Sequence, residues 1–333
     1  MKSIIGKLKT MNTPRLSVIL PAYNAARYLP ESINSILQQT FSDFELLVLN
    51  DGSVDNTEQV VLEFNDPRIV YIRNDQNIGL ANTINKGLSL ARGELIARMD
   101  ADDISLPTRL ETQVRYLDEH PDVMLCSCAL QQFGASDKQM IGREDFELVK
   151  AEMLFSSAIG HASSVWRKAF FEENHLMFMQ DEFPAEDYGL WTRAVFYGKM
   201  VNIPDLLYRY RIYPEQVTAT DMRSAEKCRQ IRQKYIARLC PYVSKEYIDA
   251  FISMDDGISA YSQWRKCVAF VRYMVRHTTS IAKPCLHRLL FGYLAQRARR
   301  DARNLPNIYQ RAMVRLEGCY FRLIKYLNFA TYV

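Results

Sequence analysis

Glu94-Leu95-Ile96-Ala97-Arg98-Met99-Asp100-Ala101-Asp102-Asp103 is the stretch that decides the fold, because a short strand pattern ends in it on a cluster of acidic side chains. An apolar run of this length, bounded by turn residues, suits a buried strand. Pro107 then stands where a helix can begin, since the N–H that proline lacks has no partner in the first helical turn. A strand, an acidic loop and a helix are therefore expected in succession.

The residues before this stretch repeat the same alternation. Further apolar runs predict strands at residues 16–20, 44–49 and 69–72, and the segments between them have the apolar spacing of helices, at 28–39, 55–64 and 79–92. This β-α-β-α-β-α-β order predicts an α/β fold with a mostly parallel central sheet flanked by helices, similar to Rossmann-like nucleotide-binding domains. Ligands bind such sheets outside the carboxyl ends of the strands. The polar residues that follow the strands, at 23–24, 50–53 and 100–103, are therefore expected to form one site.

The composition describes a folded chain whose charge is uneven. Of its 333 residues, 48% are hydrophobic and 24% are charged, which is enough for a full core. The net charge of +4 is too small to indicate nucleic acid, and we expect no nucleic-acid partner. Residues 281–333 contain ten Lys or Arg against Asp301 and Glu317, so this tail carries +8 and residues 1–280 carry −4.

The basic tail allows two interpretations. Its apolar residues recur at helical spacing between arginines, which favours a helix that packs its apolar face on the α/β domain. The alternative is peripheral contact with an anionic membrane, where basic residues contribute about 1 kcal/mol each. The sequence contains no run of about 18 apolar residues, so no membrane-spanning helix is predicted. The seven cysteines lack the spacing of a disulfide framework or a zinc site, which favours reduced thiols and a cytoplasmic location.

Asp100 and Asp102 are the candidate metal ligands. Two acidic residues one apart on a loop after a strand can both face one cation, and Mg²⁺ or Mn²⁺ prefer carboxylate, water and phosphate oxygens. Taken by itself, such a loop is more often a turn that caps the next helix. The remaining motifs decide between the two interpretations.

Several motifs together resemble glycosyltransferase family 2, in the family's order. They are Ser17-Val18-Ile19-Leu20-Pro21-Ala22-Tyr23-Asn24, Ser35-Ile36-Leu37-Gln38-Gln39-Thr40-Phe41, Phe44-Glu45-Leu46-Leu47-Val48-Leu49-Asn50-Asp51-Gly52-Ser53-Val54-Asp55, Asn77-Ile78-Gly79-Leu80-Ala81, and the run from Ala91-Arg92-Gly93 through the acidic loop. The resemblance covers about residues 15–215. It implies a GT-A type fold, inverting sugar transfer from a nucleotide-sugar donor, and a divalent metal cofactor, Mn²⁺ or Mg²⁺, which would neutralise the diphosphate leaving group.

The resemblance also implies which residues serve the donor. Asp51 corresponds to the carboxylate that reads uracil, so a UDP-sugar is expected. Asn50 stands where the family usually has a first Asp, which removes one charge. Asp102 corresponds to the more direct metal ligand. The expected nucleotide-sugar contacts are Pro21, Ala22, Tyr23, Asn24, Asp51, Arg98, Asp100 and Ala101.

On the acceptor side, Glu186-Asp187 resembles the family's acidic pair, in which the Asp is the base. An inverting transfer is a single in-line displacement, so one carboxylate must take the proton of the attacking hydroxyl. Asp187 is the candidate for this role, because the N-terminus of the predicted helix can hold its charge. His161 and Arg211 are further candidates for acceptor or phosphate contacts, although structural roles suit both residues as well. Tyr213 stands where the family commonly has a His.

We therefore predict a glycosyltransferase catalytic domain at residues 15–220, divided into a nucleotide-sugar half (15–130) and an acceptor-side half (131–220). Residues 1–14 are an N-terminal extension, and 221–333 a helical, basic region with breaks near prolines. Residues 200–213 are expected to form a strand, a turn at Pro204 and a second strand. Single sugars should be added, because the Gln-x-x-Arg-Trp motif of processive synthases is missing; Gln263-Trp264-Arg265 differs from it.

The expected acceptor is a glycan or lipid-linked glycan of bacterial surface polysaccharide, reached from the cytoplasm or the inner face of the membrane. Two alternatives remain. A metal-dependent nucleotidyltransferase would need a Gly-rich basic signature near the N-terminus, which residues 21–24 do not provide. A non-catalytic sugar-nucleotide-binding protein would lose no turnover when Asp187 is replaced.

Overall fold

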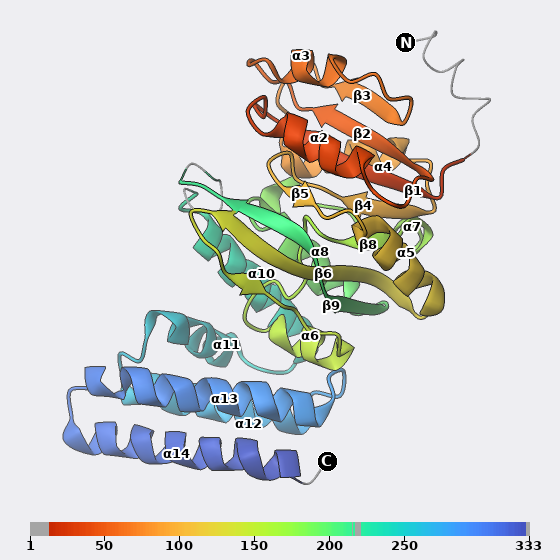
Figure 1. Cartoon of the computed structure of the whole chain (residues 1–333). Helices are drawn as coiled ribbons and strands as arrows, with labels where there is room; N and C mark the ends of the chain where they lie inside the picture. The colour runs from red at the N-terminus through yellow and green to blue at the C-terminus, as the bar shows by residue number, and fades with distance from the viewer. Residues whose placement is uncertain (1–12, 215, 217–220, 331–333) are drawn as a thin grey trace. The chain divides into compact units, whose positions relative to one another are not determined.

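The computed structural model describes residues 13–214, 216 and 221–330, together with their side chains except those of Tyr309 and of residues 323–330. Residues 1–12 of the predicted N-terminal extension and residues 331–333 of the tail lie outside this description. The chain divides into two compact units (Figure 1). The sheet unit comprises Met1–Glu144 and Ile159–Ser224, and the helical unit comprises Asp145–Ala158 and Ala225–Val333. The segment 145–158, which the sequence assigns to the acceptor-side half, thus clusters with the C-terminal helices.

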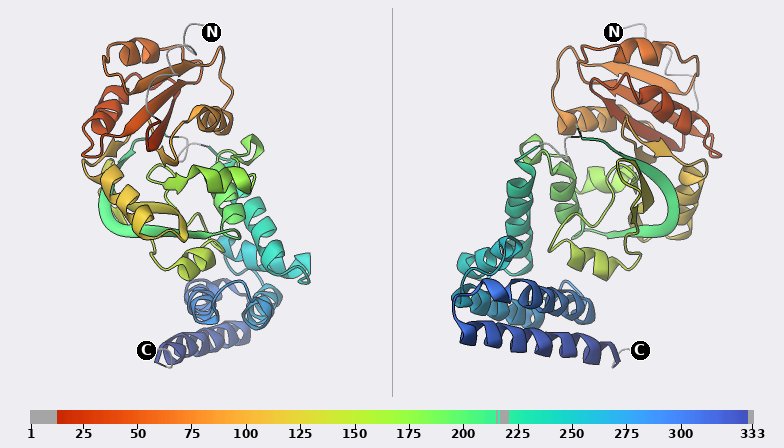
Figure 2. Two further views of the ribbon diagram at one scale, coloured as in Figure 1. Left: turned by 90° about the vertical axis from the view of Figure 1, so that its right-hand side faces the viewer. Right: turned by 60° about the vertical axis from the view of Figure 1, so that its left-hand side comes forward.

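The first half of the sheet unit is the predicted alternation of strands and helices. The strands are parallel and lie in the order β3-β2-β1-β4. The elements in chain order are β1 (Leu16–Ala22), α2 (Leu29–Leu37), β2 (Phe44–Asn50), α3 (Thr57–Leu62), β3 (Ile69–Arg73), α4 (Leu80–Leu90) and β4 (Leu95–Arg98). The chain moves outward from β1 to β3 and then returns to β4. Right-handed crossovers therefore put α2 and α4 on opposite faces of the sheet (Figure 2).

Burial explains why these strands read as continuous apolar runs. All seven residues of β1 and all seven of β2 are buried, as expected for parallel strands that are covered on both faces. Leu16, Val18 and Leu20 belong to one core cluster with Ile33 and Ile36 of α2. The predicted mostly parallel α/β fold is confirmed.

The second half of the sheet unit extends the sheet with mixed pairing, in the order β4-β8-β6-β9-β5. Its elements are β5 (Ile104–Ser105), α5 (Arg109–Glu119), β6 (Val123–Gly134), β7 (Gln139–Met140), β8 (Val165–Arg167), α7 (Lys168–Glu173), η2 (Gln180–Glu182), α8 (Glu186–Ala194) and β9 (Lys199–Ile212). The strand β9 is long and curved (Figure 2). It runs parallel to β6, and its last part pairs with β5, Ile104 opposite Arg209.

The expected turn at Pro204 is wrong. β9 continues through this proline, and the extra residues are absorbed as an irregularity in the pairing with β6. Cys128 pairs with Ile203 and the next residue, Ala129, pairs with Leu206. A bulge leaves its extra residues unpaired, so a proline there breaks no ladder hydrogen bond.

The helical unit contains α6 (Phe146–Glu152), α10 (Ser224–Leu239), α11 (Lys245–Ile252), η3 (Ser253–Asp256), α12 (Tyr261–His277), α13 (Lys283–Asp301), η4 (Ala302–Asn304) and α14 (Ile308–Ala330). α13 packs against α12 and α14, and its residues Leu286, Leu290 and Leu294 are fully buried. The apolar face that the sequence identifies in this part of the tail is therefore used for packing inside the helical unit. None of the helices, within the residues described, is long and apolar enough to cross a bilayer.

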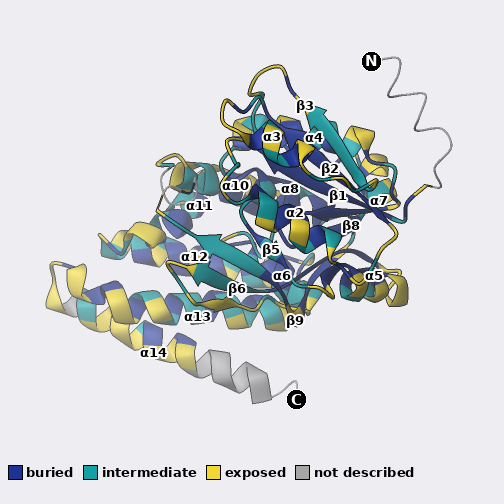
Figure 3. Cartoon of the chain, turned by 45° about the horizontal axis from the view of Figure 1, so that its top comes forward, coloured by how far each residue is buried: buried dark blue, intermediate teal, exposed yellow. Residues whose placement is uncertain are grey.

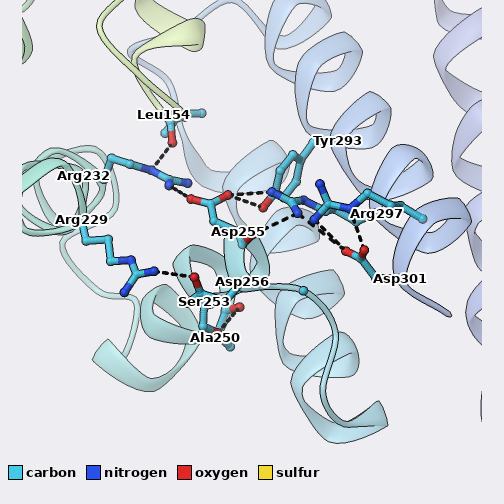
Figure 4. Close-up of polar contacts among 12 residues, drawn as sticks. Leu154, Arg229, Arg232, Ala250, Ser253, Asp255, Asp256, Tyr293, Arg297 and Asp301 are labelled. Atoms are coloured by element: carbon cyan, nitrogen blue, oxygen red, sulfur yellow. Dashed lines mark hydrogen bonds and ion pairs between the residues drawn. The ribbon is translucent and has the colours of Figure 1, made fainter. Parts of the chain in front are cut away.

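An Arg–Asp network joins several helices of this unit (Figure 4). Asp255 of η3 accepts hydrogen bonds from Arg297 at 3.0 Å and from the Tyr293 hydroxyl at 3.1 Å, and it also pairs with Arg232. Arg232 in turn donates to the backbone oxygen of Leu154 at 2.9 Å. This last contact ties the segment 145–158 to α10.

Candidate active site

The loop after β1 is held by the loop after β2. Asn24 has a positive φ of 49°. Its backbone N–H donates to Ser53 Oγ at 2.9 Å, and its Oδ1 accepts from the backbone N–H of Val54 at 3.0 Å. Neighbouring Tyr23 is 51% exposed, while Pro21 and Ala22 are buried in the strand. The strand therefore ends by projecting Tyr23 and Asn24 at the carboxyl edge of the sheet.

Asp51 is a buried carboxylate, 4% exposed, that organises the neighbouring loop. It accepts hydrogen bonds from the Asn74 amide at 2.8 Å and from the backbone N–H groups of Ile78 and Gly79 at 2.9 and 3.0 Å. Gly52 beside it has φ +68°, and a Cβ there would lie 2.5 Å from the backbone of residue 76. Only glycine fits this close approach.

The departure at Asn50 has a structural reason. Its amide donates to the Tyr71 hydroxyl at 2.9 Å, and its Oδ1 accepts from the backbone N–H of Ser53 at 2.9 Å. An aspartate could not donate to Tyr71 and could bond to it only by accepting from its hydroxyl. Asn50 is 1% exposed, so the carboxylate charge that this departure removes would have been a buried one.

Three carboxylates converge after β4. Asp100, Asp102 and Asp103 each place one oxygen within 4.8 Å of the others. Arg98, which is fully buried, donates to Asp100 Oδ1 at 2.6 Å and also to the backbone oxygen of Met99. The structure thus makes Arg98 a support for Asp100 inside the sheet.

The end of β9 reaches the same loop. The Tyr213 hydroxyl donates to Asp102 Oδ2 at 2.7 Å, and Arg211 donates from Nε to the backbone oxygen of Asp102 at 2.6 Å. The Arg211 backbone N–H donates to Asp103 Oδ1 at 2.8 Å, and its guanidinium pairs with Glu31. Arg211 is therefore engaged in supporting the acidic loop.

Electrostatic repulsion within the loop is visible in its pKa values. Burial, followed by the charge of Asp100, raises the pKa of Asp102. Burial and the charges of Asp100 and Asp102 raise the pKa of Asp103 well above its ordinary value. Burial also raises the pKa of Tyr213, so its phenol stays protonated and can donate to Asp102. Like charges held this close favour a bound cation.

A cavity of about 500 Å³ lies over the acidic loop and the first loop. It brings together many of the predicted donor-side residues and adds others that the sequence reasoning missed. Those predicted are Pro21, Tyr23, Asn24, Asp100, Ala101 and Asp102, and those missed are Ala25, Arg27 and Tyr28. Tyr213, noted in the sequence only as a departure from the family pattern, also lines it. The sequence signal that could have identified Arg27 and Tyr28 as site residues is their position between Asn24 and the helix α2.

Tyr28 lies between two guanidinium groups. The Arg27 guanidinium carbon is 4.8 Å from the centre of its ring and that of Arg211 is 4.2 Å away. The Tyr213 ring is 5.5 Å from that of Tyr28. Arg27 is exposed and lines the cavity, so it can offer positive charge to an anionic ligand.

The acidic pair begins α8, as the sequence predicts for a carboxylate held at a helix N-terminus. Glu186 is 4% exposed, whereas Asp187 is half-buried. Burial and the charge of Asp187 raise the pKa of Glu186 to about 8. The charges of Arg98 and Asp100 also act on the pKa of Glu186.

His161 lies in an aromatic cluster. Its ring centre is 5.1 Å from that of Phe178 and 6.1 Å from that of Trp191, and its backbone oxygen accepts from Ser164. Burial, followed by the Arg98 charge, lowers the pKa of His161 well below its ordinary value. A neutral, packed imidazole accounts for its position.

An acidic loop at the carboxyl edge of a mostly parallel sheet is the arrangement found here, and comparison with known proteins identifies the family. The model of glycosyl transferase family 2 matches residues 17–180. An uncharacterized glycosyltransferase of Haemophilus influenzae is 33% identical over 253 residues, 72% of this chain and 77% of that protein. The chain belongs to glycosyltransferase family 2 and is an enzyme of the glycosyltransferase class.

One further relative has a defined reaction in its name. The UDP-Glc:alpha-D-GlcNAc-diphosphoundecaprenol beta-1,3-glucosyltransferase WfgD of Escherichia coli is 44% identical over 99 residues, 30% of this chain and 39% of that protein.

Two solved structures share the fold. TarS residues 1–349 of S. aureus, in complex with UDP-GlcNAc, has a TM-score of 0.60 at 18% identity, over 93% of this chain and 90% of that one. The mannosyltransferase PcManGT of Pyrobaculum calidifontis, in complex with GDP-Man and Mn²⁺, has a TM-score of 0.54 at 18% identity, over 96% and 88%. These likenesses show a GT-A type fold.

Proposed function

We propose that this protein transfers a single sugar, with inversion, from a UDP-sugar to a hydroxyl of a glycan or lipid-linked glycan, with Mn²⁺ or Mg²⁺ as cofactor. The observation that carries the proposal is the convergence of three carboxylates within 4.8 Å. Two of them, Asp100 and Asp102, line a cavity that the loop after β1 also lines. A nucleotide-sugar presents a base, a ribose and a diphosphate, which suits a cavity with polar loops at one side and an acidic, cation-attracting loop at the other.

The donor would lie along the carboxyl edge of the sheet. Tyr23, Asn24 and Arg27 all line the cavity. We assign Tyr23 and Asn24 to the base and ribose, and Arg27 to the diphosphate. Asp51 accepts three hydrogen bonds within the protein, and a carboxylate has about four acceptor positions. We assign the remaining acceptor position to the imide N–H of uracil. The UDP-glucose named for the E. coli relative supports uridine as the base.

The donor set fits a hard divalent cation. Asp100 uses one carboxylate oxygen for Arg98, and Asp102 uses one for Tyr213, so the other oxygen of each is the candidate ligand. Asp103 is fully buried and acts behind them. When bound, the metal would act as a Lewis acid that neutralises the leaving diphosphate, worth several kcal/mol by rough estimate. The Mn²⁺ in the related mannosyltransferase structure supports this cofactor class.

Asp187 is the proposed base. The acceptor hydroxyl oxygen attacks the anomeric carbon of the donor, the bond from that carbon to the phosphate oxygen breaks, and the nucleoside diphosphate leaves with the bonding electrons. Asp187 takes the hydroxyl proton during the attack. Glu186, whose pKa lies at about 8, keeps its own proton at neutral pH. A neutral Glu186 leaves Asp187 as the member of the pair that can accept the proton.

The acceptor and the location follow from weaker indications. The diphosphoundecaprenol in the relative's name supports a lipid-linked glycan acceptor and a role in bacterial surface polysaccharide synthesis. All seven cysteines are free thiols, which suits the cytoplasm. Gln263 donates a hydrogen bond to Ser253 and Trp264 is fully buried within the helical unit, which supports a structural role for this segment.

Thermal stabilisation by a nucleotide panel tests the donor and the metal. We expect UDP and UDP-sugars to raise the unfolding temperature in Mn²⁺, to do so less in EDTA, and GDP to do so least. Asp187→Asn should keep this stabilisation and lose turnover by roughly 10²–10⁴-fold. Asp181→Asn, an exposed acid nearby, is the matched control and should keep turnover. No stabilisation by any nucleotide would refute the donor assignment, and full turnover in Asp187→Asn would refute the base.

A further inference from the structure

The helix α14 has one covered face and one bare apolar face. Val314 and Phe321 are buried at 0% and 1% exposure, and a Cβ on Gly318 would lie 2.4 Å from Ala298 of α13. This face packs against α13. Exposed residues, yellow in Figure 3, recur along the rest of α14, and several of them have large apolar side chains. They are Ile308 at 73% exposure, Met313 at 45%, Leu316 at 65% and Tyr320 at 54%.

These exposed residues form a stripe. Ile308, Leu316 and Tyr320, with the exposed Ala312 between them, recur every four residues, so they lie on one side of the helix. Met313 widens the stripe. At a rise of about 1.5 Å per residue, the stripe extends for about 18 Å. Contiguous exposed apolar surface of this kind marks a site of interaction.

Arginines line one edge of this α14 stripe. At about 100° per residue, Arg311, Arg315 and Arg322 fall between the stripe and the buried face. Arg315 and Arg322 are exposed, and Arg311 is half-buried and donates to the backbone oxygen of Leu305. No ion pair of the three is found within the described part of the chain. Glu317, the acidic residue of α14, lies elsewhere on the helix and accepts a hydrogen bond from Trp264. The stripe is therefore bordered by positive charge that has no counter-charge on its own helix.

We propose that α14 lies flat on an anionic phospholipid membrane, with the α14 stripe in the headgroup and acyl boundary and the three arginines on lipid phosphates. An apolar face bordered by basic residues is the pattern of interfacial helices. A nucleic acid would neutralise the arginines and leave the stripe in water. A second copy packed through its own α14 would cover the stripe, but the one carboxylate of that helix, Glu317, already accepts a hydrogen bond from Trp264. This inference does not depend on the proposed sugar transfer.

Vesicle flotation of the full chain tests the proposal, with phosphatidylcholine vesicles that contain or lack phosphatidylglycerol. We expect binding to the anionic vesicles. Replacing Arg311, Arg315 and Arg322 together by Gln should weaken it on the order of 100-fold. The same replacement at Arg265, Arg272 and Arg276, exposed arginines of α12, removes equal charge and should change binding by about twofold at most.

The apolar contribution has its own matched pair. Ile308→Gln with Leu316→Gln should weaken binding at least about tenfold. Leu62→Gln changes a leucine of α3 with nearly the same exposure, 66% against 65%, and should have no effect. Leu316→Trp adds a reporter, because the native tryptophans Trp166, Trp191 and Trp264 are all fully buried. Its emission should shift to the blue with anionic vesicles.

Three results would overturn the proposal. The first is absence of flotation with anionic vesicles. The second is equal weakening by the α12 arginine variant or by Leu62→Gln. The third is a concentration-dependent dimer in analytical ultracentrifugation that Leu316→Gln dissociates in the absence of lipid, which would make the stripe a contact between copies. Sugar transfer to a soluble acceptor is measured separately, so its loss or survival leaves these outcomes unchanged.

Discussion

The sheet unit and the helical unit each contain a group of buried or half-buried aspartates, and the two groups are built in opposite ways. In the helical unit, Asp255 is surrounded by Arg232, Arg297 and Tyr293 (Figure 4). Asp301 pairs with Arg297 at 3.6 Å and with Arg300 at 2.6 Å. Each carboxylate there has its charge balanced by neighbouring guanidinium groups.

In the sheet unit, three aspartates face one another across the acidic loop. Among the described residues, Arg98 is the one guanidinium that pairs with a carboxylate of this loop, at Asp100. Asp102 is bonded to a neutral phenol, and its pKa is raised by burial and by Asp100. Repulsion among these carboxylates lowers the stability of the folded protein. A bound cation would relieve that repulsion. Balanced charges are typical of a structural network, as in the helical unit. The unbalanced negative charge of the acidic loop indicates a cation-binding site instead.

The strongest way to break this comparison is to neutralise Asp102. Asp102→Asn should lower kcat by roughly 10³-fold or more, because loss of a metal ligand removes several kcal/mol of leaving-group stabilisation. Its unfolding temperature without metal should stay the same or rise, since repulsion with Asp100 is relieved. Steady-state kinetics in Mn²⁺ and a thermal scan in EDTA measure the two effects. Asp205→Asn, an exposed acid of β9, is the control for both. A large fall in stability with unchanged kcat would mean that Asp102 is structural.

The converse experiment neutralises the helical network. Asp255→Asn should lower the free energy of unfolding by roughly 2–4 kcal/mol, because it leaves the Arg232 side chain, 3% exposed, without its partner carboxylate. Turnover should be unchanged. Urea denaturation supplies the measurement. The neighbouring Asp256, with a side chain 62% exposed, pairs with Arg229, and Asp256→Asn should cost less than about 1 kcal/mol. Equal costs for the two variants would show that the network around Asp255 adds nothing.

The sequence predicts the donor side of the site well because its signals are local. The apolar runs of β1, β2 and β4 place the loops after them at one edge of a parallel sheet, since each strand of this kind must end on the same side. Tyr23, Asn24, Asp100 and Asp102 therefore line one cavity. Asp51 and Arg98, which the sequence also assigns to the donor, are not among the residues that line it. Local turn chemistry also explains Gly52, where no side chain fits.

The other side of the site depends on contacts that no local pattern records. Tyr213 reaches Asp102 because β9 curves along the whole of β6 and passes through Pro204 as a bulge, where the sequence suggests a turn. The engagement of Arg211 with the acidic loop follows from the same path. Likewise, nothing near residues 145–158 in the sequence indicates that they cluster with helices that begin beyond residue 224. These features depend on pairing between distant segments, which residue periodicity does not encode.

The pH dependence of stability provides a further test of the sheet unit, through the buried carboxyl group of Glu186. Its pKa of about 8 lies above the ordinary value of 4.5, so the folded protein holds this proton more tightly than the unfolded chain. The stability that the proton supplies is complete below pH 4.5 and is lost as the pH rises towards 8. Glu186→Gln should therefore be more stable than the wild type at pH 8, by roughly 2–4 kcal/mol, and nearly equal to it at pH 4.5. Urea denaturation of both proteins between pH 4.5 and pH 8 measures this difference in the free energy of unfolding. A difference between Glu186→Gln and the wild type that stays constant across this pH range would contradict the assignment.

The smallest effect is expected at Tyr213. Its hydroxyl is a neutral partner for Asp102, whereas the aspartates of the helical unit have guanidinium partners. Tyr213→Phe removes the 2.7 Å hydrogen bond that orients the Asp102 carboxylate. A bond of this kind contributes about 1 kcal/mol, so the Mn²⁺ concentration for half-maximal activity should rise roughly three- to tenfold. At saturating Mn²⁺, kcat and the KM for the donor should return close to wild-type values, because the phenol positions a ligand and takes no proton in the reaction. Tyr242→Phe, at a tyrosine 90% exposed, is the matched control. If Tyr213→Phe instead lowers kcat at saturating metal and leaves metal activation unchanged, Tyr213 contacts the reacting groups, and the acidic loop is oriented by Arg98 and Arg211 without it.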